Sequence, residues 1–311
     1  MVETPDVRRL QHPDFVVLGA PRCGTTSLHH YLDQHPGVAM SRVKEPNFFL
    51  FDGPGDPSRP LVEAPDIIAK SVSDPEAYEH LFAGAGPGRS TGEVSVLYLY
   101  CERTPELIAG SLPAARLVAV LRHPVDRAYS HFLFTYTGAV DSVRSEFRAA
   151  AEREMGLPDT PFGAGTHVLR LGRYGPQIDR YLDVVGRDRL HLILHEDLQE
   201  RPDEVLADLC RFLDVDPSFD FDTSVAYNGS ALRGSTTRMV RQALGGTTSR
   251  LKRVLPPGAA GRLGRVRARL RRPGATPPLG AEFRRELAEW FEPSTARVEE
   301  LVGRDLSHWR R

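Results

Sequence analysis

The sequence of 311 residues predicts an α/β fold, in which helices flank a central parallel sheet of the P-loop type. Three observations support this class. Short apolar runs alternate with amphipathic stretches, as they do in successive βα units. The first apolar run is followed at once by a glycine-punctuated turn and a helix-forming segment. The length suits one elaborated hydrophobic core, so residues 1–311 are expected to form a single domain.

The strands are expected where a short apolar run is followed by a turn or a charged residue. In chain order, these runs lie at 15–18, 92–96, 117–121 and 190–194. Apolar residues that recur with helical spacing predict the helices. The helical segments lie at 25–35, 75–82, 124–137, 142–155, 176–185, 202–213 and 281–301.

The composition excludes several classes of protein. The formal net charge of −1 gives no global attraction to nucleic acid or to a membrane surface, so we expect no nucleic-acid partner. No apolar run approaches the ~20 residues of a membrane-spanning helix, and no apolar signal segment follows Met1. The three cysteines fit neither a disulfide framework nor a zinc site. We therefore expect a cytoplasmic protein without a bound metal.

Residues 223–281 differ from the rest of the chain. They contain no Asp or Glu but 12 Lys or Arg, and they include one Gly-Gly and two Pro-Pro pairs. This pattern predicts a loop-rich basic excursion with a small helix at 262–272, in which Leu263, Val266 and Leu270 share a face. The excursion is compatible with a solvated surface loop and with a basic flap over an anionic ligand.

Residues 19–26, G-A-P-R-C-G-T-T, match the pattern G-x-x-x-x-G-x-[ST] between a strand and a helix. We call them the phosphate loop. The N–H groups of such a loop converge on an anion at the positive end of a helix, and Thr25, Thr26 and Ser27 are expected to add hydroxyl donors and to cap the helix. Nucleoside triphosphatases carry a lysine after the second glycine. Here Thr25 takes that position, and the cation is Arg22, whose guanidinium can bind an oxyanion through two parallel bonds. The alternative is a glycine turn that only caps the helix.

A second anion site is predicted within LVAVLRHPVDRAYSHF, residues 117–132. Arg122 follows the buried run directly, and Pro124 marks the start of a helix. Arg122 and Ser130 are therefore expected to face a ligand in the crevice outside the carboxyl ends of the strands. Residues 122–130 are called the Arg122 segment below. Together with the phosphate loop, this segment predicts a ligand with two separated anionic ends.

The two motifs resemble those of the sulfotransferases that use 3′-phosphoadenosine 5′-phosphosulfate (PAPS). VLGAPRCGTTSLHHYLDQHPGV resembles the 5′-phosphosulfate loop of that family, and LRHPVDRAYSHF resembles its 3′-phosphate motif. KEPNFF at 44–49 resembles the segment that carries a catalytic glutamate in the carbohydrate and heparan-sulfate branch. Three further segments match the family in order: TGEVSVLYLY at 91–100, GRYGPQIDRYLDVVGRDRLHLILHEDL at 172–198 and LVGRDLSHW at 301–309.

The resemblance implies a sulfotransferase fold and a site for PAPS, whose product is 3′-phosphoadenosine 5′-phosphate. The positions that match the family's donor-binding residues are Arg22, Cys23, Gly24, Thr25, Thr26 and Ser27 for the 5′ end, and Arg122 and Ser130 for the 3′-phosphate. YNGSALRGSTTR at 227–238 resembles the loop that closes over the 3′-phosphate and the adenine, and its expected contacts are Arg233, Gly234 and Ser235.

The resemblance also implies metal-free, in-line sulfuryl transfer to an acceptor hydroxyl. Glu45 is the expected general base, and Arg22 is expected to stabilise charge on the leaving group. Lys44 either holds the sulfuryl oxygens or is a surface cation, and Glu45 could instead pair locally with Lys44 or an arginine. The rivals for the base are His29, His30, His123, His131 and Glu93. Some relatives carry a lysine after the glutamate of the GE-x-S segment, whereas this chain has Val94.

Two other functions remain as alternatives at this point. A P-loop kinase of small molecules requires Mg²⁺ and the missing lysine, and a non-enzymatic polyanion-binding module would use only the basic excursion. Under the sulfotransferase hypothesis, the partner is a small-molecule or carbohydrate acceptor. A sugar-like hydroxyl, a secondary metabolite and a glycolipid all fit, because one scaffold serves many acceptors.

Overall fold

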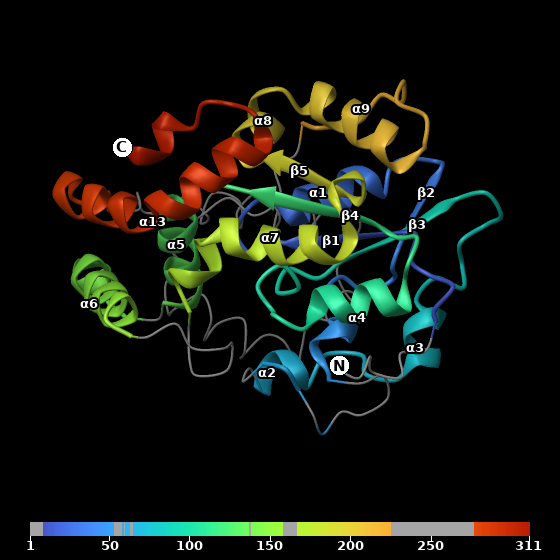
Figure 1. Ribbon diagram of the computed structural model, residues 1–311, viewed down its shortest axis with the longest axis horizontal. Helices are drawn as coiled ribbons and strands as arrows, with labels where there is room; N and C mark the ends of the chain where they lie inside the picture. The colour runs from blue at the N-terminus through green and yellow to red at the C-terminus, as the bar shows by residue number, and fades with distance from the viewer. Residues whose placement is uncertain are drawn as a thin grey trace, which may run out of the picture.

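The computed structural model describes residues 9–52, 58, 60–62, 65–136, 138–157, 167–224 and 277–311 (Figure 1). A five-stranded sheet with the order β2-β3-β1-β4-β5 lies at its centre, and every pair of neighbours is parallel. The strands are β1 (Phe15–Gly19), β2 (Val38–Met40), β3 (Ser90–Val94), β4 (Arg116–Leu121) and β5 (Leu190–Leu194). The predicted α/β class with a parallel sheet is confirmed.

Burial on both faces explains why the central strands β1 and β4 are almost continuously apolar. All five residues of β1 are buried, and so are the last five of β4. Between β1 and β3, the ring of Phe15 lies over Gly92, where a Cβ atom would be 2.0 Å from Phe15 Cζ. Only glycine therefore fits at this position of the TGEVS segment. The strand β2 was not predicted, because three residues are too few to stand out as an apolar run.

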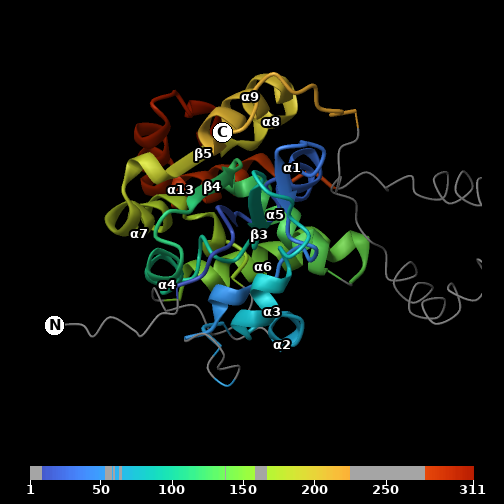
Figure 2. The same cartoon turned by 90° about the vertical axis from the view of Figure 1, so that its right-hand side faces the viewer.

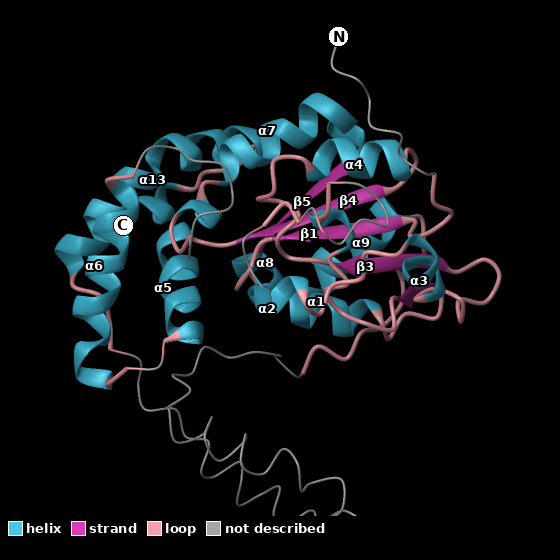
Figure 3. Cartoon of the chain, turned by 90° about the horizontal axis from the view of Figure 1, so that it is seen from below, coloured by secondary structure: helices cyan, strands magenta, loops and turns pink. Residues whose placement is uncertain are grey.

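Helices cover both faces of the sheet (Figures 2 and 3). Helix α1 lies on one face, and α4 and α7 lie on the other, while α8 and α9 contact β5. The helices are α1 (Thr25–Leu32), α2 (Pro65–Ile68), α3 (Pro75–His80), α4 (Thr104–Ser111), α5 (Pro124–Thr135), α6 (Val143–Met155), α7 (Tyr174–Val185), α8 (His195–Glu200), α9 (Pro202–Leu213) and α13 (Ala281–Val302). Short 3₁₀ turns occur at Phe48–Leu50, Val140–Ser142, Arg170–Gly172, Arg187–Arg189 and Ser307–Arg310.

The core has two parts. The larger cluster of buried side chains surrounds the sheet, and a second cluster lies between α5, α6 and α13. Phe147 and Phe291, both fully buried, are at the centre of the second cluster. This group of helices is seen at one end of the molecule in Figure 3. It fixes α5, which carries the Arg122 segment, against the rest of the fold.

The sheet order determines where the predicted functional segments meet. Because β3, β1 and β4 are parallel neighbours, the segments that follow them lie along the same edge. The phosphate loop follows β1, and Arg122 follows β4. Most of the basic excursion, with the helix predicted at 262–272 and with Arg233, Gly234 and Ser235, lies outside the described residues. Among the residues described, no helix is both long and apolar enough to cross a membrane.

Candidate active site

The phosphate loop leads from β1 into the N-terminus of α1. Gly24 is the residue before the helix and has φ = +89°, in the left-handed region that favours glycine. A Cβ atom there would lie 2.8 Å from Nδ1 of His195, so the loop and α8 are in close contact. The first intrahelical hydrogen bond runs from Leu28 N to Gly24 O at 3.1 Å. The N–H groups of residues 25–27 consequently have no acceptor within their own helix.

The expectation that Thr25, Thr26 and Ser27 cap α1 is wrong. The helix begins at Thr25, so all three residues lie inside its first turn. The capping position belongs to Gly24, which has no side chain, and no side-chain cap hydrogen bond forms. No side-chain cap therefore neutralises the positive end of the α1 dipole. An anion site at a helix N-terminus needs the N–H groups in this uncapped state.

Cys23 is oriented into the core rather than toward the loop's open side. Its side chain is fully buried, and burial raises the pKa of the thiol to about 11. Its N–H donates to Ala20 O at 3.3 Å. Any contact of Cys23 with a bound anion would need that N–H to change its partner.

Arg22 reaches from the loop to α5. It has φ = +69°, and its Nε donates to Ser130 Oγ at 3.1 Å. Its guanidinium carbon lies 4.8 Å from the centre of the Phe134 ring. Ser130 and Phe134 are four positions apart on α5, so they present one face to the guanidinium.

Arg122 completes the junction between the two predicted anion sites. Its Nη1 donates to the carbonyl oxygen of Arg22 at 3.2 Å. Within the part of the chain that the structure describes, no carboxylate forms an ion pair with Arg122. The structure thus brings Arg22, Arg122 and Ser130 together, although they come from two motifs about 100 residues apart. The result is a concentration of positive charge beside the N-terminus of α1.

Three of the four histidines that rival Glu45 as base, His29, His123 and His131, are poorly suited to that role. His123 Nδ1 accepts a hydrogen bond from Val125 N at 3.2 Å, which caps α5. Burial, Arg127 and Arg22 lower the pKa of His131 to about 3, so this ring stays neutral and is a weak base. Burial likewise lowers the pKa of His29 to about 4. His30 is half-buried with its ring against His29, at a centroid distance of 5.5 Å.

Glu93 lies on β3 and is completely buried. Its carboxylate accepts hydrogen bonds from Tyr78 Oη at 2.8 Å and from Ser95 Oγ at 2.7 Å. Burial raises the pKa of Glu93 to about 7, although these hydrogen bonds favour the charged form. A carboxylate without exposed surface cannot reach an acceptor hydroxyl in this arrangement, so Glu93 is not a rival of Glu45 as base.

Glu93 instead supports the loop that carries Glu45. The hydroxyl of Ser95 accepts a hydrogen bond from Asn47 N at 3.0 Å, and Asn47 Nδ2 donates to Glu45 O at 3.0 Å. Glu45 N donates to the carbonyl of Val94, the last residue of β3, at 2.8 Å. The φ angles of Glu45 and Asn47 are +61° and +54°, conformations that persist where the surroundings enforce them. Strand β3 therefore fixes the backbone of Glu45 at the same edge of the sheet as the phosphate loop.

The side chain of Glu45 is 39% exposed and pairs with Lys44, with Nζ and Oε1 2.6 Å apart. This ion pair is the local pairing that was one of the two alternatives for Glu45. An exposed pair of this kind contributes little to stability and separates at little cost, so the pair is compatible with either alternative.

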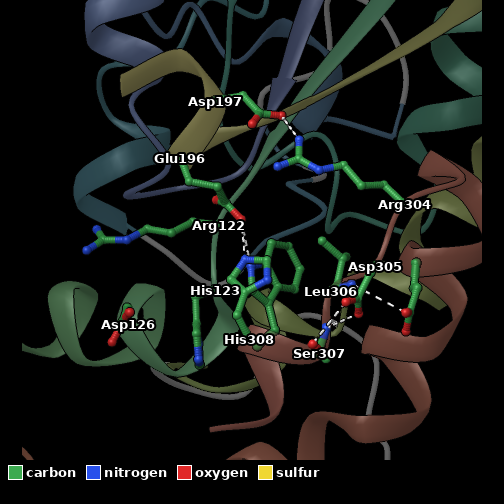
Figure 4. A network of polar contacts seen from close by, with 12 residues as sticks. Arg122, His123, Asp126, Glu196, Asp197, Arg304, Asp305, Leu306, Ser307 and His308 are labelled. Carbon is green, nitrogen blue, oxygen red and sulfur yellow. Dashed lines mark hydrogen bonds and ion pairs between the residues drawn. The ribbon is translucent and has the colours of Figure 1, made fainter. Parts of the chain in front are cut away.

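The last turn of the chain, Ser307–Arg310, packs beside the site and contacts α8 (Figure 4). Glu196 on α8 accepts a hydrogen bond from Trp309 Nε1 at 2.7 Å and lies 3.1 Å from His308 Nε2. Figure 4 shows Arg122 and His123 beside this group. The LVGRDLSHW segment thus packs against α8 and against the Arg122 segment, where the ring of Trp309 lies 6.3 Å from that of His123.

Three comparisons with known proteins each match sulfotransferases. The model of the Sulfotransferase family matches residues 99–220. The crystal structure of a sulfotransferase from Alicyclobacillus acidocaldarius has a TM-score of 0.66 and 29% identity, covering 97% of this chain and 100% of that chain.

Two curated proteins are similar over shorter regions. The bifunctional heparan sulfate N-deacetylase/N-sulfotransferase of Drosophila melanogaster is 28% identical over 221 residues, which cover 70% of this chain and 21% of the fly protein. Carbohydrate sulfotransferase 15 of Mus musculus is 26% identical over 151 residues, which cover 39% of this chain and 27% of the mouse protein. The chain therefore spans only about a fifth to a quarter of these relatives.

Proposed function

We propose that this chain, which belongs to the sulfotransferase family, transfers a sulfuryl group from PAPS to an acceptor hydroxyl on a sugar-like molecule. The observation that carries the proposal is the junction of the two phosphate motifs. Arg22 Nε donates to Ser130 Oγ, and Arg122 Nη1 donates to Arg22 O, at 3.1 and 3.2 Å. Such a junction suits a nucleotide with a charged group at each end.

The residues present fit this donor. The first-turn N–H groups of α1 and the guanidinium of Arg22 are suited to the 5′-phosphosulfate, because the helix lacks a side-chain cap. Arg122 and Ser130 are suited to the 3′-phosphate. Arg233, Gly234 and Ser235 remain proposed contacts for the 3′-phosphate and the adenine. A triphosphate fits less well, since Thr25 stands where a lysine would contact the β- and γ-phosphates.

In the proposed reaction, a sulfuryl group moves in line from a phosphate leaving group to an attacking oxygen. Arg22 would stabilise the negative charge that develops on the leaving oxygen, a role suited to a guanidinium already fixed in place. The first-turn N–H groups would hold the phosphate oxygens still, so that catalysis rests on placement and electrostatics. Lys44 is proposed to contact the sulfuryl oxygens from the Glu45 loop.

Glu45 is proposed to accept the proton of the acceptor hydroxyl. Its side chain is partly exposed, whereas the carboxylate of Glu93 is buried and His131, with a pKa of about 3, is a weak base. Before it acts as a base, the carboxylate would exchange its contact with Lys44 for one with the acceptor. Lys44 would then be released toward the sulfuryl oxygens, so one rearrangement would serve both residues.

The names of the curated relatives support the choice of acceptor class. One is a carbohydrate sulfotransferase, and another acts on heparan sulfate as an N-sulfotransferase. We therefore propose a saccharide acceptor. We propose a sugar hydroxyl as the group that is sulfated. A sugar amino group is the second candidate, because one relative is named as an N-sulfotransferase.

The proposal is tested by calorimetry and by mass spectrometry. Purified protein should bind 3′-phosphoadenosine 5′-phosphate without Mg²⁺, and it should bind ATP with Mg²⁺ much more weakly. With PAPS and a panel of hydroxylated and aminated saccharides, a product heavier by one sulfuryl group is expected. Tight binding of Mg²⁺–ATP with no binding of the bisphosphorylated nucleotide would instead support a kinase.

A further inference from the structure

One buried hydroxyl contacts both phosphate motifs. Tyr174 Oη donates a hydrogen bond to the carbonyl oxygen of Arg122 at 3.0 Å. The same oxygen lies 3.6 Å from Sγ of Cys23 in the phosphate loop. Because the loop follows β1 and Arg122 follows β4, this side chain bridges the ends of two neighbouring strands.

The chemistry of Tyr174 favours a fixed contact. The side chain is 1% exposed, and burial raises the pKa of its hydroxyl well above the ordinary value. The hydroxyl therefore keeps its proton and can donate to the Arg122 carbonyl at any physiological pH. Leaving a buried carbonyl without a hydrogen bond would lower the stability of the folded protein. The backbone of Arg122 is therefore expected to keep its position relative to the tyrosine ring.

The position of the tyrosine is itself fixed by α13 and by the last turn of the chain. Tyr174 is the first residue of α7, and the N–H of the next residue, Gly175, donates a hydrogen bond to Ser294 Oγ at 2.9 Å. A Cβ atom at Gly175 would be 2.9 Å from Arg297 Cβ, so α7 and α13 are in close contact there. On the other side, the ring of Trp309 lies 6.2 Å from that of Tyr174. The tyrosine is thus held by α13 and the last turn, and both elements also contact the Arg122 segment, since Arg284 on α13 pairs with Asp126 and the ring of Trp309 lies 6.3 Å from that of His123.

We propose that Tyr174 is a positioning residue, which holds the phosphate loop and the Arg122 segment at the separation that a nucleotide with both a 5′- and a 3′-phosphate requires. This inference rests on the proposed function, because it assumes that one ligand spans both motifs. Tyr174 itself does not touch the donor. A residue of this kind affects ligands that use both motifs and spares ligands that use only one.

The test compares Tyr174→Phe with the matched control Tyr181→Phe. Tyr181 is on the same helix, is fully buried, and donates to the Tyr98 carbonyl at 2.8 Å without contacting either phosphate motif. Calorimetry would measure the binding of 3′-phosphoadenosine 5′-phosphate, adenosine 5′-phosphate and adenosine 3′-phosphate. In Tyr174→Phe we expect the bisphosphate to bind about five- to tenfold more weakly, with each monophosphate within about twofold of wild type. In Tyr181→Phe all three affinities should stay unchanged.

Hydrogen exchange of the ligand-free proteins provides a second readout. The amides of residues 20–24 and 122–125 should exchange faster in Tyr174→Phe than in Tyr181→Phe. Equal weakening of all three nucleotides, or unchanged bisphosphate affinity, would overturn the inference. If wild type binds none of these nucleotides, the proposed donor is wrong. In that case hydrogen exchange alone tests the role of Tyr174. Unchanged exchange of both segments in Tyr174→Phe would exclude a positioning role for this residue.

Discussion

The Nε atom of Arg22 donates a hydrogen bond to Ser130 Oγ, a residue 108 positions further along the chain. The first residue belongs to the phosphate loop and the second to the Arg122 segment. The cation assigned to the 5′ end of the donor is therefore already in contact with the hydroxyl assigned to the 3′ end. Arg22 lies between the two predicted anion sites and can serve either.

Arg22→Ala should weaken binding of 3′-phosphoadenosine 5′-phosphate by about 1.5–3 kcal/mol, the range for hydrogen bonds to a charged group. Ser130→Ala should have a smaller effect, because it removes a neutral partner. Isothermal titration calorimetry measures both. Arg211→Ala is the control, since that exposed arginine pairs with Asp208 on α9, away from the site. Unchanged affinity in Arg22→Ala would refute the assignment of this residue.

Glu45→Gln should retain donor affinity and lower kcat by about 10²–10⁴-fold, the usual contribution of a positioned base. The reason is that glutamine keeps the shape of the side chain but cannot accept the acceptor proton. Steady-state rates and nucleotide titrations together separate the two effects. Glu204→Gln alters a comparable surface pair with Arg201 and should change neither quantity. Normal turnover in Glu45→Gln would remove this residue from the mechanism.

The pH dependence of stability should report the burial of Glu93. Its pKa of about 7 in the folded protein lies above the ordinary 4.5, so folding favours the protonated carboxyl. The associated stability is fully present below about pH 4.5 and is lost as the pH rises toward about 7. Across this interval, the free energy of unfolding of wild type should fall relative to Glu93→Gln by up to about 3 kcal/mol. Urea unfolding at several pH values measures this difference, and a constant difference would contradict the assignment.

Gly24→Ala should destabilise the protein and weaken nucleotide binding. The new Cβ atom would meet His195 Nδ1 at 2.8 Å, and alanine is disfavoured at φ = +89° by about 1 kcal/mol. Gly86→Ala is the matched control, since its nearest contact would be Arg89 Cδ at 3.9 Å. Thermal unfolding with and without 3′-phosphoadenosine 5′-phosphate compares the two variants. Equal melting temperatures would show that the loop tolerates a side chain.

Much of the fold could be predicted from the sequence, because the buried strands β1, β4 and β5 are mostly apolar and many of the helices between the strands are amphipathic. The predicted strand at 190–194 coincides with β5. Helix α4 escaped prediction because it is buried on several sides, as Leu107 and Ile108 show. Helix α8 was missed because its six residues are mostly polar.

The site could be predicted only in part. Glycine spacing and the arginine after a strand identified the two phosphate motifs, but no pattern in the sequence shows which side chains meet across 108 positions. The role proposed for Tyr174 was not predicted, because the sequence does not show which groups the hydroxyl of a tyrosine contacts in the folded protein. Glu93 is a rival base by its residue type alone, and only the structure shows that its carboxylate is completely buried.

Strand β1 separates the strand that anchors Glu45 from the strand that leads to Arg122. Glu45, proposed to contact the acceptor, and Arg122, proposed to contact the 3′-phosphate of the donor, are thus attached to strands on opposite sides of β1. If the proposed roles are correct, the residues around Glu45 could be exchanged without displacing Arg122, because the two are attached to different strands.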